Sequence, residues 1–131
     1  MISAKDFQDG DYIKYQSNRV LKITDAVNMQ AIDVNGNTVL YSNGCCPNIG
    51  LDDEVLQICG FTQEGSIWKH NIGDSTIIRY NDGVCKLRNP YKGPQDKDLC
   101  VLSILQDFVR DYTGKELPIN HQTLAEYIRN L

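Results

Sequence analysis

The first 41 residues follow the two-residue period of short strands, with polar turns between the apolar runs. Apolar positions alternate over 12–15 and 20–24, and Asn35-Gly36 separates two further alternating runs. Asn and Gly tolerate the positive φ angles that a two-residue hairpin turn requires. The block 7–41 is therefore predicted to form four or five short antiparallel strands, as a small SH3-like β barrel or a bent sheet.

Residues 51–60 change to helical spacing. Apolar residues recur three and four positions apart, acids fill the first turn where the helix dipole favours negative charge, and Gly60 follows as a stop. A short helix is predicted here, after a loop over 42–50. The two-residue period returns over 61–87, so a helix followed by an antiparallel meander is predicted for 51–87.

Residues 89–98 interrupt both periods. Pro90, Gly93 and Pro94 stand here among charged residues. Proline lacks the amide hydrogen that regular structure uses, and glycine favours turns. We therefore expect a mobile loop over 89–98 with no regular structure, and we leave open whether it orders on binding.

Two helices are predicted to close the chain over 99–131. Apolar residues recur at helical spacing through the first helix, which Gly114 ends. Asn120 is expected to cap the last helix, whose apolar stripe either completes the core or docks a partner or a second copy. Together with the preceding strands, these helices predict one α+β domain over 1–131, a meander packed by C-terminal helices.

Composition narrows the class of protein without deciding its function. Of the 131 residues, 41% are hydrophobic and 23% are charged, which is typical of a globular domain. The net charge of -4 disfavours long-range attraction to the phosphates of nucleic acids. No apolar run approaches the roughly 18 residues of a membrane span, and no secretion signal opens the chain, so a cytoplasmic protein without a membrane partner is predicted.

The cysteines and histidines are the first candidates for chemistry. The five cysteines are Cys45, Cys46, Cys59, Cys85 and Cys100. Their irregular spacing lacks the close pairs of a zinc site, so no metal and no cofactor are expected. The adjacent pair is the best candidate for a nucleophile, with His70 or His121 as its base, but no protease signature surrounds it and a plain loop is the simpler interpretation. The other three thiols lie in apolar runs and are interpreted as core residues.

The middle and last parts of the chain carry a recognisable fingerprint. Its main elements are Cys59-Gly60-Phe61, Trp68, the run 78–83, Leu105-Gln106-Asp107 and Thr113-Gly114-Lys115-Glu116-Leu117. Through these residues the chain resembles a group of small uncharacterised proteins of Bacteroides-type gut bacteria and of their phages and mobile elements. The resemblance covers about residues 7–119 and implies a fold and a mobile-element context, without an activity.

The chain departs from that group at two places. Many members carry a His in the closing helix, where this chain has Ser103, and many end soon after Glu116-Leu117. A catalytic or ligand role for that helix position is therefore not expected here. The segment 120–131 is where this protein is expected to have a feature of its own.

Aromatic residues interleaved with cations suggest a surface for nucleic acid. The residues proposed for it are Tyr12, Lys14, Tyr15, Lys86 and Lys92. The alternative is that the tyrosines are core or rim residues and the lysines are solvated, which the acidic net charge favours. A second candidate set, Arg79, Arg88 and Tyr91, lies near the loop over 89–98 and suggests sequestration of a small nucleotide-like ligand between protomers.

No group of residues has the spacing of a known catalytic site. The acids at Asp52, Asp53 and Glu54 are interpreted as first-turn residues of a helix. The sequence therefore predicts a non-enzymatic accessory or binding protein, encoded by a phage or mobile element and present in the host cytoplasm. It is expected to act through a protein–protein or self-association surface, with nucleic-acid binding and ligand sequestration as alternatives.

Overall fold

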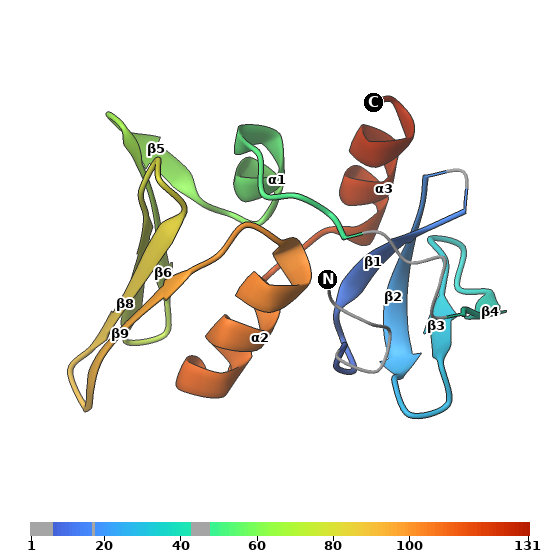
Figure 1. Ribbon diagram of the computed structural model, residues 1–131, viewed down its shortest axis with the longest axis horizontal. Helices are drawn as coiled ribbons and strands as arrows, with labels where there is room; N and C mark the ends of the chain where they lie inside the picture. The colour runs from blue at the N-terminus through green and yellow to red at the C-terminus, as the bar shows by residue number, and fades with distance from the viewer. Residues whose placement is uncertain (1–6, 17, 43–47) are drawn as a thin grey trace. The chain divides into compact units, whose positions relative to one another are not determined.

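The computed structural model describes residues 7–16, 18–42 and 48–131, and the chain divides into two compact units (Figure 1). The first unit contains the chain up to Ile49 together with Asn120–Leu131, and the second contains Gly50–Ile119. Each unit combines an antiparallel sheet with helix, so the predicted α+β class is confirmed. The expectation of one domain over 1–131 stays a prediction.

The first unit is built on a four-stranded sheet. Its strands are β1 (Tyr12–Tyr15), β2 (Arg19–Asp25), β3 (Gln30–Ile32) and β4 (Thr38–Leu40). They pair antiparallel in chain order. Between residues 7 and 42, position 17 aside, β4 does not pair with β1, so the described sheet is open and no closed barrel is found.

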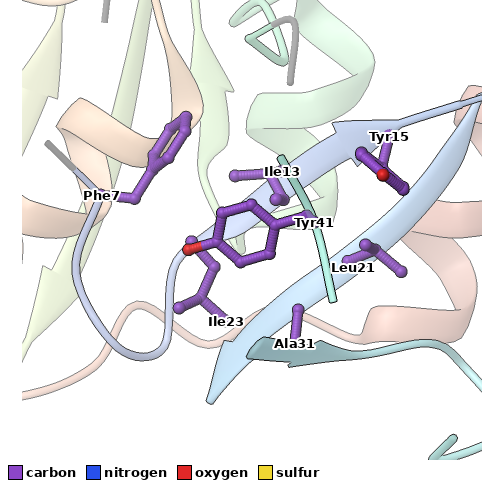
Figure 2. Close-up of a cluster of buried hydrophobic side chains, with 7 residues drawn as sticks. All are labelled: Phe7, Ile13, Tyr15, Leu21, Ile23, Ala31 and Tyr41. Atoms are coloured by element: carbon purple, nitrogen blue, oxygen red, sulfur yellow. The ribbon is translucent and has the colours of Figure 1, made fainter. Parts of the chain in front are cut away.

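One face of this sheet carries the core of the first unit (Figure 2). The buried side chains of the cluster are Phe7, Ile13, Tyr15, Leu21, Ile23, Ala31 and Tyr41. Ile13 lies opposite Leu21, and Ile23 lies opposite Ala31, so alternate residues of three strands meet on this face. Alternate residues of these strands therefore supply the buried face, and Tyr15, which the sequence suggested for a nucleic-acid surface, is among them.

Helix α3 (His121–Arg129) belongs to the first unit and packs on β2. Its N-cap is Asn120, whose side chain accepts a hydrogen bond from the backbone N–H of Thr123, as predicted. The buried residues Leu124 and Ile128 show that its apolar stripe completes this unit. The His121 Nε2 atom lies 2.7 Å from the carbonyl oxygen of Val20, which joins the first turn of α3 to β2.

The turn between β3 and β4 is longer than the predicted two-residue Asn-Gly turn. Ile32 pairs with Thr38, so five residues form the connection. The carboxylate of Asp33 accepts hydrogen bonds from the backbone N–H groups of Asn35 and Asn37 at 2.9 Å each. These two hydrogen bonds stabilise a turn of five residues, whereas the Asn-Gly dipeptide alone predicts a turn of two.

The second unit is a five-stranded meander with two helices among its described residues. Its elements are α1 (Asp53–Ile58), β5 (Thr62–Glu64), β6 (Ile67–Ile72), β7 (Ser75–Arg79), β8 (Val84–Asn89), β9 (Lys92–Asp98) and α2 (Leu102–Thr113). The strands pair antiparallel in the order β5-β6-β7-β8-β9. Gly114, with φ 71°, ends α2 in the left-handed conformation, so both predicted helices are confirmed.

The expectation of an irregular loop over 89–98 is wrong, because β9 occupies Lys92–Asp98 and pairs with β8. Proline is tolerated in a strand at the edge of a sheet, where one row of N–H groups has no partner strand. β9 is such an edge strand, and its side chains are mostly exposed. Pro94 therefore marks an edge strand here and not a break in the structure.

The remaining structural expectations concern the thiols and membranes. Burial raises the pKa of Cys59 to about 12 and that of Cys85 to about 11, so both are protonated core residues, as predicted. Cys100 is exposed, and its assignment to the core is wrong. Among the described residues, no helix has the length and apolar character needed to cross a membrane.

Candidate functional site

Helix α1 of the second unit presents a polar face to solvent. The side chain of Asp52 accepts a hydrogen bond from the backbone N–H of Val55 at 2.8 Å and so caps the helix. Val55 and Leu56 are buried, which leaves Asp53, Glu54 and Gln57 on the exposed side. Asp53 and Glu54 are therefore confirmed as first-turn residues, and their side chains are exposed, whereas Asp52 precedes the first turn as the N-cap.

Gly60 turns the chain from α1 into β5. It has φ 96°, and a Cβ atom at this position would lie 2.8 Å from Nε2 of His70. The next residue, Phe61, donates its backbone N–H to the carbonyl oxygen of Leu56 at 3.0 Å. Only glycine fits this turn without strain, and the turn holds the start of β5 close to the end of α1.

The short hairpin of β5 and β6 sets the direction of two further side chains. Glu64 pairs with Ile67 across the two-residue connection, and Gln63 pairs with Trp68. In a two-residue hairpin the flanking pair exchanges both hydrogen bonds, so the next pair does not. The side chains of Gln63 and Trp68 therefore lie on the same face, while the backbone N–H and C=O of Gln63 point away from β6.

A groove of about 590 Å³ lies between α1 and this hairpin. Its lining residues are Asp53, Glu54, Gln57, Gly60, Phe61, Thr62, Gln63 and Trp68. We call it the α1–β5 groove. Phe61 and Trp68 are 3% and 8% exposed and form its apolar floor, and the acids and amides form an exposed rim. The rim carries two carboxylates and no cation, so the groove favours positively charged or hydrogen-bond-donating groups.

His70 lies directly behind the floor of this groove. Its ring packs edge-to-face on Phe61, with centroids 5.2 Å apart, and its Nε2 atom is buried without a hydrogen-bond partner. Burial lowers the pKa of His70, against the opposing effect of backbone groups of Cys59 and Asn71. The imidazole is therefore held neutral at neutral pH and supports Phe61 as a packing residue.

The residues predicted to bind nucleic acid are divided between the units. Tyr12 and Tyr15 are buried in β1, and the Tyr12 ring packs on His121 at 5.1 Å between centroids. Lys14 is half-buried on the same strand. In the second unit, Lys86 lies 5.5 Å from the centroid of the Tyr80 ring, and Lys92 Nζ donates to the carbonyl oxygen of Tyr112.

The residues predicted to bind a small ligand do not converge. Arg79 pairs with Cys85, and Arg88 pairs with Thr76, so the two guanidinium groups leave opposite faces of the sheet. Arg79 Nη2 lies 3.4 Å from the carbonyl oxygen of Leu99, and Arg88 forms an ion pair with Asp96 at 2.8 Å. Tyr91 is 81% exposed in the turn between β8 and β9.

The proposed nucleophiles Cys45 and Cys46 lie outside the described residues. Over 7–16, 18–42 and 48–131, no group of three or more His, Cys, Asp or Glu side chains could hold a metal ion. Comparison with protein-family models, with curated proteins and with solved structures found no match. The resemblance to mobile-element proteins therefore stays a prediction.

The α1–β5 groove was not predicted from the sequence, although parts of its signal are present there. Asp53 and Gln57 are four residues apart on a predicted helix, and Gly65-Ser66 is a two-residue hairpin signal that fixes the pairing of Gln63 with Trp68. The missing information is the distance between α1 and β5, which depends on the conformation of Gly60.

Proposed function

We propose that the protein is a non-enzymatic binding protein that engages a partner protein through the α1–β5 groove. The observation that carries this proposal is the combination of two nearly buried aromatic side chains, Phe61 and Trp68, with an exposed rim of carboxylates and amides. An apolar floor supplies affinity, and a few polar groups at the rim supply specificity. A volume of about 590 Å³ accommodates side chains of a partner.

The charges at the rim favour protein over nucleic acid as the partner. Asp53 and Glu54 would repel a phosphate backbone. The alternative, nucleic-acid binding through an SH3-like aromatic and basic face, needs accessible rings at Tyr12 and Tyr15, and both are buried. The predicted phage or mobile-element origin is compatible with an accessory role of this kind, and it rests on the resemblance alone.

Peptide selection on the full chain tests this proposal. A random dodecapeptide library is selected on the wild-type protein, and the enriched peptides are measured against two variants. Gln57→Trp places a large side chain in the groove, whereas Gln122→Trp makes the same change on the exposed side of α3. We expect Gln57→Trp to weaken binding at least about tenfold and Gln122→Trp to leave it unchanged.

Two results would overturn the proposal. One is that the enriched peptides bind the Gln57→Trp variant as tightly as the wild type. The other is that a single-stranded oligonucleotide of twenty thymidines binds the protein more tightly than any selected peptide does. In the second case the exposed cations of the five-stranded sheet become the site to examine.

A further inference from the structure

We infer that the α1–β5 groove takes a basic segment of the partner in extended conformation, which adds as a strand to the free edge of β5. This inference rests on the proposed function and specifies the chemistry of the partner. Three features support it: the backbone groups of the β5 edge, the contrast between the two edges of the sheet, and the charges at the rim.

The free edge of β5 offers one donor and one acceptor, both on Gln63, a residue that lines the groove. β5 has β6 as its only neighbour in the described sheet. Residues 61, 63 and 65 alternate with those that bond to β6, and the outward N–H of Phe61 is already donated to Leu56. The N–H and C=O of Gln63 are therefore the groups that an added strand would pair with.

The opposite edge of the same sheet is protected in a way that β5 is not. β9 carries Pro94 together with lysines and aspartates, the residues with which proteins prevent edge-to-edge pairing. β5 has the sequence Thr-Gln-Glu, all three residues are exposed, and it contains neither Pro nor Lys. The sheet therefore has one blocked edge and one edge open to a short segment.

The rim charges decide which segment fits. Asp53 and Glu54 lie on the side of the groove formed by α1, and the lining contains no Lys, Arg or His. Side chains alternate in an extended strand, so every second residue of the added segment would point into the groove. Lys or Arg at alternate positions would lay its aliphatic stem on Trp68 and its charge near these carboxylates.

The test uses an acetylated octapeptide of alternating threonine and lysine with a fluorescent label. Binding to the full chain is measured by anisotropy at about 50 mM and about 300 mM NaCl. An octapeptide of alternating threonine and glutamate serves as the charge control. A peptide with four threonines followed by four lysines serves as the pattern control. We expect the alternating lysine peptide to bind best and to weaken at the higher salt concentration.

Charge removal at the rim tests the role of the carboxylates. The double variant Asp53→Asn/Glu54→Gln should weaken binding of the alternating lysine peptide about tenfold. The matched double variant Asp98→Asn/Asp111→Asn removes the same charge from exposed acids that do not line the groove. It should change the dissociation constant less than about twofold. Equal effects of the two variants would overturn the inference.

Removal of one backbone donor tests the strand mode. Gln63→Pro deletes an N–H that does not bond to β6, so the ladder is retained, and Gln63→Ala deletes the same side chain but keeps the N–H. We expect the proline variant to bind about fivefold more weakly than the alanine variant. If the proline variant fails to fold, lysine peptides N-methylated at alternate positions replace it, and one methylated set should lose binding while the other keeps it.

The outcomes separate this inference from the proposed function. If selected peptides of another composition bind and Gln57→Trp blocks them, the groove binds protein but the basic-segment inference is wrong. If the chain forms a dimer that Gln57→Trp dissociates, the occupant is a second copy and the inference is also wrong. If Gln57→Trp blocks no peptide, both the function and the inference are wrong.

Discussion

Gly60 determines where the groove lies, because its backbone conformation turns the chain within the three residues, 59–61, that join α1 to β5. Glycine is required at this position for two reasons. Its φ is 96°, and a Cβ atom here would lie 2.8 Å from Nε2 of His70. His70 in turn packs on Phe61, which is part of the groove floor. One residue without a side chain thus links the turn, the half-buried imidazole of His70 and the candidate site.

The variant Gly60→Ala should lower the free energy of unfolding by about 2–3 kcal/mol, from about 1–2 kcal/mol of backbone strain and the clash with His70. Gly93→Ala is the matched control, because nothing lies within 4 Å of its added Cβ and it has no positive φ. It should change stability by less than about 0.5 kcal/mol. Urea unfolding measures both, and equal effects would contradict this account of the turn.

His70 should make stability fall as the pH decreases below about 6.5, the pKa of an unfolded histidine. The folded ring has a lowered pKa, so in that window the unfolded state binds more protons than the folded state does. Above that window both states are neutral, and the loss ends once the folded ring also protonates. Urea unfolding between pH 8 and pH 4 should show a smaller decrease for His70→Gln, and an unchanged decrease would contradict the assignment.

At the scale of the elements, capping residues and apolar spacing predicted the helices well, whereas the pairing of the strands was predicted less well. Asp52 caps the start of α1, and Gly60 follows its end. Gly114 ends α2, and Asn120 caps the start of α3. These signals are readable in the sequence because a cap acts within a few residues of the helix end. Strand β9 was not predicted, because a proline indicates a break in regular structure unless the strand lies at the edge of a sheet. The groove was missed for a similar reason, since its two sides meet only through the tertiary fold.

Removal of the cap on α1 should destabilise the second unit and its groove together. Asp52→Ala should cost about 1 kcal/mol of unfolding free energy, because the backbone N–H of Val55 loses its acceptor. Asp53→Ala removes an exposed acid from the same turn and should cost less than about 0.5 kcal/mol. Denaturant unfolding of the two variants makes the comparison, and a larger loss for Asp53→Ala would contradict the capping role.

At the scale of the whole molecule, the chain builds one unit from its two ends and the other from its middle. The segment Asn120–Leu131 belongs with the N-terminal sheet, although 70 residues of the second unit, Gly50–Ile119, separate them in sequence. The apolar stripe of this segment was predicted, but the choice between core and docking surface was left open. Leu124 and Ile128 resolve it in favour of packing on β2.

Two leucine substitutions near the C-terminus test that packing. Leu124→Ala should destabilise the first unit by about 2–4 kcal/mol, because the side chain is fully buried. Leu131→Ala deletes the same atoms from a residue that is 71% exposed and should cost less than about 0.5 kcal/mol. Thermal and denaturant unfolding compare them, and similar losses would show that α3 does not complete the core.

The central claim is that the α1–β5 groove binds a partner segment, and a titration followed by ¹⁵N–¹H NMR tests it most directly. The protein is titrated with the peptide selected most strongly and with the alternating lysine peptide. The account predicts that the largest shifts fall on the backbone amide of Gln63 and the indole N–H of Trp68, because both residues line the groove. Shifts confined to Lys86 and Tyr80 on the sheet of the second unit, or to the first unit, would contradict it.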